Sequence, residues 1–116
     1  MNDQATPPDV PEIRQLSAVE VKQLLGSDAT IELVDVRTEE ERAIASIEGS
    51  RLLDQAYHDA LLLRDRETPL VFQCHHGIRS QRAAEYFRHH GFRNLYNLSG
   101  GIDAWSLLVD RSVPRY

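Results

Sequence analysis

The amino-acid sequence predicts an α/β fold in which helices cover both faces of a mostly parallel sheet. Short runs of β-branched and apolar residues alternate along the 116 residues with segments of helical spacing. Residues 31–36 and 70–73 are largely apolar on both sides, which is typical of buried parallel strands. Such strands are joined by right-handed crossovers, so the chain is expected to form a sandwich of helices, sheet and helices.

The composition identifies the class of protein. Hydrophobic residues make up 41% of the chain and charged residues 27%, and no run of about 18 apolar residues occurs, which excludes a disordered or membrane-spanning chain. Residues 1–11 are polar and contain three prolines, so we expect a flexible N-terminal arm followed by a single domain over residues 12–116. The arm resembles neither a secretory signal nor a transit peptide, which predicts a cytoplasmic protein.

The first elements are a short strand and a capped helix. Residues 13–16 have the composition of a strand. Ser17 and Glu20 then have the spacing of a capping box, in which each side chain bonds the backbone of the other residue. This pattern predicts a helix that begins after Ser17 and ends at Gly26.

The next segment begins with the central strand at residues 31–36. Thr38 and Glu41 repeat the capping pattern and predict a short helix. A brief strand and turn follow near residues 47–49, and residues 56–63 have the apolar spacing of a helix.

A second buried strand, residues 70–73, leads directly into Cys74. Residues 75–79 are expected to form a loop, and Ser80 is expected to begin a helix that ends at Gly91. The inner face of this helix is predicted to carry Ala83, Ala84 and Phe87.

The last elements are a third strand and an amphipathic helix. Residues 94–98 have the composition of a strand, and the pair Gly100 and Gly101 marks a backbone turn. Residues 102–109 are expected to form a helix that is anchored by Trp105 and Leu108.

Cys74 is the candidate nucleophile because of its place in the predicted fold. Ligands of open α/β sheets bind beyond the carboxyl ends of the strands, and Cys74 follows such an end. The loop after it contains Gly77, so its backbone N–H groups can turn inward and form an anion-binding nest beside a helix N-terminus. These donors and Arg79 are expected to lower the pKa of the thiol. A free cysteine is also common as a small buried apolar side chain, but the glycine, the arginine and the helix start together favour chemistry.

The charges are distributed unevenly along the chain. A net charge of −5 argues against binding to nucleic acid or to an anionic membrane. Between Cys74 and Arg93, however, four arginines stand against one acidic residue. This basic segment contains the single cysteine, which has no internal partner for a disulfide and must pass any product to another molecule.

Other charged residues near the predicted site have structural explanations. His75 and His76 suggest a metal, but a metal site requires three or four convergent ligands, so we predict two loop side chains at the rim of a pocket and neither metal nor cofactor. Asp35 and Arg37 stand at the end of another strand. We expect Asp35 to accept backbone N–H bonds and Arg37 to tie its loop to Glu41, which makes both scaffold residues.

Three blocks of sequence together resemble the rhodanese family of sulfurtransferases, specifically its small single-domain members. The first block is Leu-Val-Asp-Val-Arg at 33–37 with Glu41, and the second is Cys-His-His-Gly-Ile-Arg-Ser at 74–80 with Arg82 and Ala83. The third is Leu-Ser-Gly-Gly-Ile-Asp-Ala-Trp at 98–105. All three stand in the order and spacing of the family, and the resemblance spans about residues 13–109.

The resemblance implies a three-layer α/β/α sandwich with a central five-stranded parallel sheet, ordered 3-2-4-5-1. It also implies that Cys74 takes a sulfane sulfur from a small anionic donor such as thiosulfate and carries it as a persulfide. The acceptor would be cyanide in vitro, or a thiol or protein cysteine in the cell. The persulfide would be bound by the loop residues His75, His76, Gly77, Ile78, Arg79 and Ser80, while Arg79 and Arg82 would steer the dianionic donor.

Two alternatives belong to other classes of function. The first is a non-enzymatic persulfide sensor or docking module that keeps the loop. A cysteine-dependent phosphatase or arsenate reductase is disfavoured because four residues separate Cys74 from Arg79 here, whereas the phosphatases that resemble this fold have five. The oligomeric state and the physiological donor and acceptor do not follow from the sequence.

Overall fold

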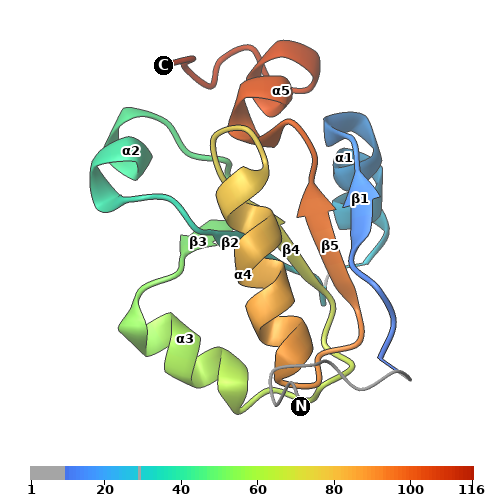
Figure 1. Ribbon diagram of the computed structural model, residues 1–116. Helices are drawn as coiled ribbons and strands as arrows, with labels where there is room; N and C mark the ends of the chain where they lie inside the picture. The colour runs from blue at the N-terminus through green and yellow to red at the C-terminus, as the bar shows by residue number, and fades with distance from the viewer. Residues whose placement is uncertain (1–9, 29) are drawn as a thin grey trace.

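Five short strands form one parallel sheet in the computed structural model, which describes residues 10–28 and 30–116 (Figure 1). The strand order is β1-β5-β4-β2-β3, which is the order that the family resemblance implied, read from the opposite edge. The strands are β1 (Arg14–Leu16), β2 (Glu32–Asp35), β3 (Ser50–Leu52), β4 (Leu70–Gln73) and β5 (Leu95–Leu98). The predicted α/β fold with a five-stranded parallel sheet is confirmed.

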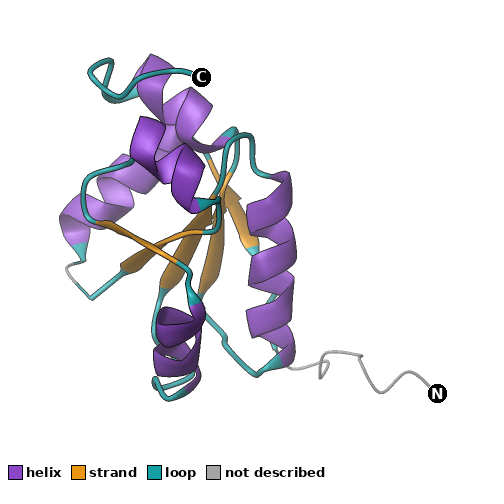
Figure 2. Cartoon of the chain, turned by 90° about the vertical axis from the view of Figure 1, so that its left-hand side faces the viewer, coloured by secondary structure: helices purple, strands orange, loops and turns teal. Residues whose placement is uncertain are grey.

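Helices cover both faces of this sheet and make three layers (Figure 2). The helices are α1 (Ala18–Ser27), α2 (Glu39–Ile44), α3 (Gln55–Leu62), α4 (Ile78–His89) and α5 (Gly101–Leu108). One face packs on α1 and α5, and the other packs on α3 and α4. Neighbouring strand residues serve opposite faces, since Leu33 and Val71 belong to the first core while Val34 and Phe72 belong to the second.

Both predicted capping boxes are present. At the start of α1, Ser17 N–H donates to the Glu20 carboxylate at 2.9 Å, and Glu20 N–H donates to Ser17 Oγ at 3.2 Å. At the start of α2, the same reciprocal pair joins Thr38 and Glu41 at 3.2 and 3.1 Å. Each box satisfies backbone donors that a helix start otherwise leaves unpaired, which explains why these short helices begin where the sequence predicts.

Three details of the predicted elements are wrong. The brief strand expected near residues 47–49 is β3 at Ser50–Leu52, after the turn rather than before it. Leu108 does not anchor α5, since it is 64% exposed, and Ile102 with Trp105 forms the buried side of that helix instead. The helix after the cysteine loop begins at Ile78 rather than at Ser80, because Gly77 turns the chain with a φ of 108° and serves as the N-cap.

The predicted arm at residues 1–11 falls mostly outside the described residues. The last two residues of this arm, Val10 and Pro11, are described. Their carbonyls accept hydrogen bonds from Arg88 at 3.0 and 2.9 Å. Within the described ranges, no helix combines the length and the apolar character that crossing a bilayer requires.

The carboxyl edge of the sheet brings two predicted groups of residues together. β2 and β4 are neighbours, with Asp35 opposite Gln73 in the register. The Asp35–Arg37 segment and the Cys74 loop therefore leave the sheet side by side, at the edge where α/β folds bind their ligands.

Candidate active site

The loop after β4 encloses the sulfur of Cys74, which is 1% exposed. The Gly77 N–H donates to Sγ at 3.0 Å and the Ser80 N–H donates at 3.4 Å. The Ser80 hydroxyl lies 3.3 Å from the same sulfur. The nest of donors that the sequence predicts is thus formed around the thiol.

These donors lower the pKa of Cys74. Burial opposes them, because it disfavours the charged thiolate and is the largest single influence on this group. The Ser80 hydroxyl and the backbone N–H groups of Ser80, Gly77 and His76 together outweigh the burial. The N-terminus of α4 adds the positive end of a helix dipole.

A lowered pKa predicts that Cys74 reacts with an alkylating agent as a thiolate at neutral pH. The alkylation rate plotted against pH should have its midpoint below the ~8.5 of a free thiol. Ser80→Ala removes the donor hydroxyl and should raise that midpoint. A wild-type midpoint at or above ~8.5 contradicts this prediction.

The N-terminus of α5 holds the loop from the opposite side. The Ile102 N–H donates to the Cys74 carbonyl at 2.8 Å, and the Asp103 N–H donates to the His75 carbonyl at 3.2 Å. Because these bonds hold the Cys74 and His75 carbonyls toward α5, the N–H groups of the loop are free to face the sulfur. The close approach requires Gly101, where a side chain would collide with the same two carbonyl oxygens.

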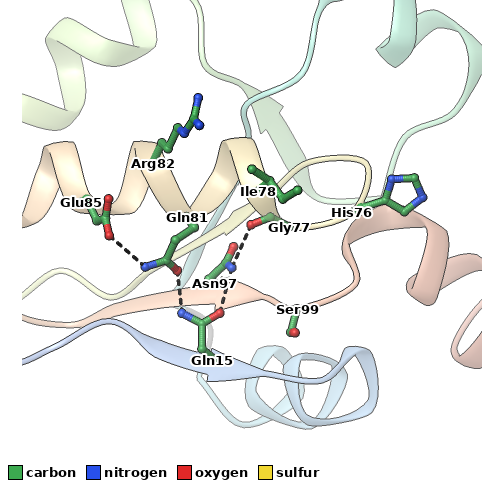
Figure 3. A pocket seen from close by; sticks show the side chains of 9 residues that line it. All are labelled: Gln15, His76, Gly77, Ile78, Gln81, Arg82, Glu85, Asn97 and Ser99. Atoms are coloured by element: carbon green, nitrogen blue, oxygen red, sulfur yellow. Dashed lines mark hydrogen bonds between the residues drawn. The ribbon is translucent and has the colours of Figure 1, made fainter.

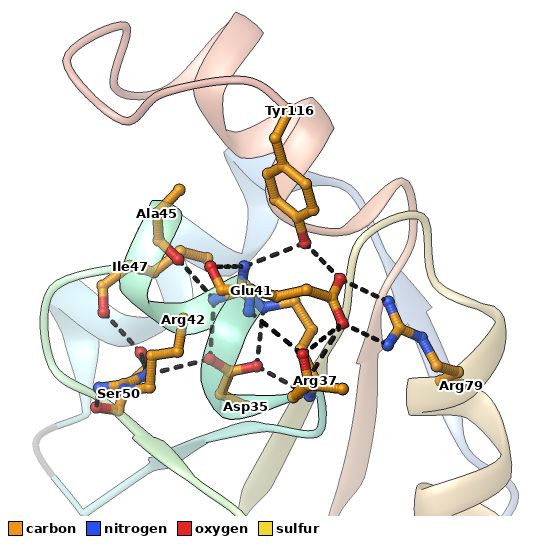
Figure 4. Close-up of polar contacts among 10 residues, drawn as sticks. Asp35, Arg37, Glu41, Arg42, Ala45, Ile47, Ser50, Arg79 and Tyr116 are labelled. Atoms are coloured by element: carbon orange, nitrogen blue, oxygen red, sulfur yellow. Dashed lines mark hydrogen bonds and ion pairs between the residues drawn. The ribbon is translucent and has the colours of Figure 1, made fainter.

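Arg79 forms an ion pair with Glu41 of α2 (Figure 4). Its guanidinium donates to the two carboxylate oxygens at 2.7 and 2.9 Å, and this pair holds the pKa of Glu41 well below its usual range. Arg82, one helical turn further along, makes no hydrogen bond or ion pair within the described residues. The two arginines predicted to steer an anion therefore differ, and Arg82 is the one without a fixed partner.

Asp35 and Arg37 form a buried scaffold beside the loop, as the sequence predicts (Figure 4). Asp35 accepts the Arg37 backbone N–H at 3.1 Å and two guanidinium bonds from Arg37 at 2.9 and 2.8 Å. Arg42 adds a bond to the same carboxylate at 3.0 Å. Arg37 also reaches the carbonyls of Glu41 and Ala45, which ties α2 to the end of β2.

Tyr116 joins this scaffold to the cysteine loop, a contact that sequence reasoning missed. Its hydroxyl accepts a bond from Arg37 at 3.1 Å and donates to Glu41 at 2.7 Å. Its ring stacks on His75, with ring centroids 4.1 Å apart. No motif or periodicity includes a tyrosine so distant in sequence, so only the folded chain reveals its place at the site.

One group of side chains in the described residues has three potential metal ligands, namely His75, His76 and Asp103, whose ligand atoms lie within 4.8 Å of one another. Arg115 already bonds the Asp103 carboxylate at 2.9 and 3.3 Å. The two imidazole rings lie with their centroids 3.9 Å apart and are inclined to each other by 30°. The absence of a metal remains a prediction.

A pocket of about 530 Å³ lies beside the loop, between α4 and the ends of β1 and β5 (Figure 3). His76 and Gly77 of the loop line it, together with Ile78 and Arg82 of α4. Ile78, the first residue of α4, is 69% exposed. The predicted loop residues thus have two sides, one directed at the sulfur and one directed at this pocket.

The chain is similar to known proteins over most of its length. The family model for the rhodanese-like domain matches residues 17–108. The thiosulfate sulfurtransferase GlpE of Ectopseudomonas mendocina is 36% identical over 95 residues, which cover 81% of this chain and 85% of that protein. The GlpE of Pseudomonas aeruginosa is 37% identical over 93 residues, covering 79% and 83%.

Solved structures have the same fold. A rhodanese-like domain protein of Staphylococcus aureus aligns over 90% of this chain and 99% of its own, with a TM-score of 0.71 and 27% identity. A Rhodopseudomonas palustris protein of unknown function, called a possible tyrosine phosphatase, aligns over 90% of this chain and 85% of its own, with a TM-score of 0.69 and 24% identity. The second likeness concerns the fold alone.

Proposed function

The chain belongs to the rhodanese-like domain family, and on this premise we propose that it is a thiosulfate sulfurtransferase that carries sulfur on Cys74. One observation carries the assignment of the residue. The buried Cys74 sulfur lies within a loop whose N–H groups point at it, and those donors lower the pKa of the thiol. A site of this kind favours a thiolate before the reaction and an anionic sulfur after it.

The first half of the reaction loads the enzyme. The Cys74 thiolate attacks the outer sulfur of thiosulfate and forms a new S–S bond. The S–S bond of thiosulfate breaks, and sulfite leaves with its electron pair. The negative charge then lies on the outer sulfur of the persulfide, next to the loop whose Gly77 and Ser80 N–H groups donate to Cys74 Sγ before the reaction.

The second half unloads the enzyme. A thiophilic nucleophile attacks the outer sulfur, the persulfide S–S bond breaks, and the Cys74 thiolate is restored. With cyanide the product is thiocyanate, and with a thiolate the product is a new persulfide. We propose a thiol or a protein cysteine as the acceptor in the cell.

Charge near the loop favours an anionic donor. Arg82 has no partner among the described residues, and Arg79 keeps part of its guanidinium exposed beside Glu41. We assign the steering of thiosulfate mainly to Arg82, because Glu41 neutralises much of the field of Arg79. The proposed chemistry needs a reduced thiol, which a cytoplasmic location maintains.

The assay that tests the function measures transfer from thiosulfate to cyanide alongside hydrolysis of an aryl phosphate. We expect thiocyanate to form and aryl phosphate turnover to be negligible. Four residues between Cys74 and Arg79 make a smaller ring than a phosphoryl group requires, and Arg79 is held by Glu41. No acid lies within residues 75–79 to protonate a leaving alcohol.

This assay, together with the mass of the thiosulfate-treated protein, separates the alternatives. Efficient aryl phosphate hydrolysis that requires Cys74 would replace the sulfurtransferase assignment with a phosphatase. A protein that gains sulfur on Cys74 but passes none to cyanide or to a small thiol would be a persulfide sensor or docking module.

A further inference from the structure

We propose that Asn97 is a positioning residue for Cys74, because its one buried amide binds both Gly77 and Ser80, two of the residues that donate to the cysteine sulfur. Asn97 lies near the end of β5 and is 3% exposed. In the sheet it stands opposite Phe72, two residues before Cys74, so strand alternation directs both side chains to the face covered by α4. None of the sequence motifs assigns this asparagine a role.

The orientation of the Asn97 amide is determined by its partners. Its Nδ2 donates to the Gly77 carbonyl at 3.1 Å and to Gln15 Oε1 at 2.9 Å (Figure 3). The Gly77 carbonyl is an acceptor only, so the nitrogen must face it and Oδ1 must face the other way. There Oδ1 accepts the Ser80 hydroxyl at 2.5 Å.

Two of the three partners of Asn97 act on the sulfur. The Gly77 N–H donates to Sγ at 3.0 Å, and the Ser80 hydroxyl lies 3.3 Å from Sγ. Asn97 therefore holds both groups relative to the cysteine, and its own side-chain hydrogen bonds go to Ser80, Gly77 and Gln15.

The Ser80 hydroxyl has a single proton, which Asn97 and Cys74 share. While Cys74 is a thiol, its S–H points at Ser80 Oγ and the hydroxyl proton goes to Asn97. When the thiolate forms, the hydroxyl turns to the sulfur, because a bond to an ion is about twice as strong as a neutral one. Asn97 does not prevent this turn, and its bond from Nδ2 to the Gly77 carbonyl is unaffected by it, so the main effect of Asn97 on the thiolate is to hold Gly77 in place.

This geometry predicts the effect of removing the amide. In Asn97→Ala the loop donors lose their support, and the alkylation midpoint of Cys74 should rise by about one pH unit. At a pH below the wild-type midpoint that shift reduces the thiolate population by up to about tenfold. The rate of sulfur loading from thiosulfate should fall by a similar factor. Ser80→Ala should raise the midpoint as well, and the double variant should show less than the sum of the two shifts.

Gln15 provides the matched control. Gln15→Ala removes one partner of Asn97 but leaves its bonds to Gly77 and Ser80, so the alkylation midpoint should stay at the wild-type value. Asn97→Ser keeps a polar group in the buried site. It replaces Asn97→Ala in the alkylation experiment if the alanine variant does not fold. It should raise the midpoint by less than the alanine variant.

The readout distinguishes this inference from the proposed function. Alkylation of Cys74 requires no sulfur transfer, so the shift should appear even in a protein that fails the thiosulfate assay. A folded Asn97 variant, verified by its circular dichroism spectrum, with an unchanged midpoint would show that the amide is only structural. A lowered midpoint would show that Asn97 competes for the Ser80 proton, and it would equally overturn the positioning role.

Discussion

Cys74→Ser should abolish sulfur transfer from thiosulfate to cyanide, with a fall in turnover of roughly three orders of magnitude or more. A serine hydroxyl has a pKa far too high to ionise in this loop, and it cannot form a stable persulfide. Cys74 is the single cysteine of the chain, so no other thiol can take over the reaction. The same change should leave the fold intact, because serine is similar in size and the loop offers it hydrogen-bond partners.

Intact mass spectrometry measures the carrier directly. After treatment with thiosulfate, the wild-type protein should gain the mass of one sulfur atom and lose it again on treatment with a reducing thiol. Cys74→Ser should gain nothing. Measurable thiocyanate production by a folded Cys74→Ser protein would mean that the sulfur does not pass through this residue.

Much of the fold could be predicted from local sequence patterns, because the physical causes are local. The capping boxes at Ser17 and Thr38 depend on residues three places apart, and both are present in the structure. The strand at residues 70–73 is apolar on both sides and occupies the predicted positions. The prediction that Leu108 is buried is wrong. Helical spacing indicates an apolar stripe along a helix, but it does not indicate which residues of the stripe another element covers.

The candidate site was only partly predictable. Cys74 and Gly77 could be identified because a strand end, a glycine and a helix start follow one another in sequence. Asn97 and Tyr116 could not, since their contacts with Ser80 and His75 join positions far apart in the chain. A buried asparagine on a strand was the available signal for Asn97, but its partners are known only from the fold.

Gly101→Ala should be the most disruptive substitution outside the cysteine, because Gly101 is the point where α5 meets the active loop. Its φ is +60°, and an added Cβ would lie well inside contact distance of the Cys74 and His75 carbonyl oxygens. The left-handed backbone costs a non-glycine residue about 1–2 kcal/mol. Overpacking adds about 1–3 kcal/mol, and relief requires the loop or α5 to move. We expect the free energy of unfolding to fall by about 2–5 kcal/mol and the alkylation midpoint of Cys74 to rise.

Gly26→Ala is the matched control, since it is the same chemical change in α1 with no atom within 4 Å of the added Cβ. Alanine favours a helix interior over glycine by about 0.5–1 kcal/mol, so this variant should be neutral or slightly more stable. Denaturant unfolding measures the stability, and alkylation against pH measures the loop. If Gly101→Ala unfolds like Gly26→Ala and keeps the wild-type midpoint, the contact between α5 and the loop does not hold the donors around the sulfur. If instead Gly101→Ala lowers the free energy of unfolding and raises the alkylation midpoint, the α5 N-terminus helps to hold the loop donors that keep the pKa of Cys74 low.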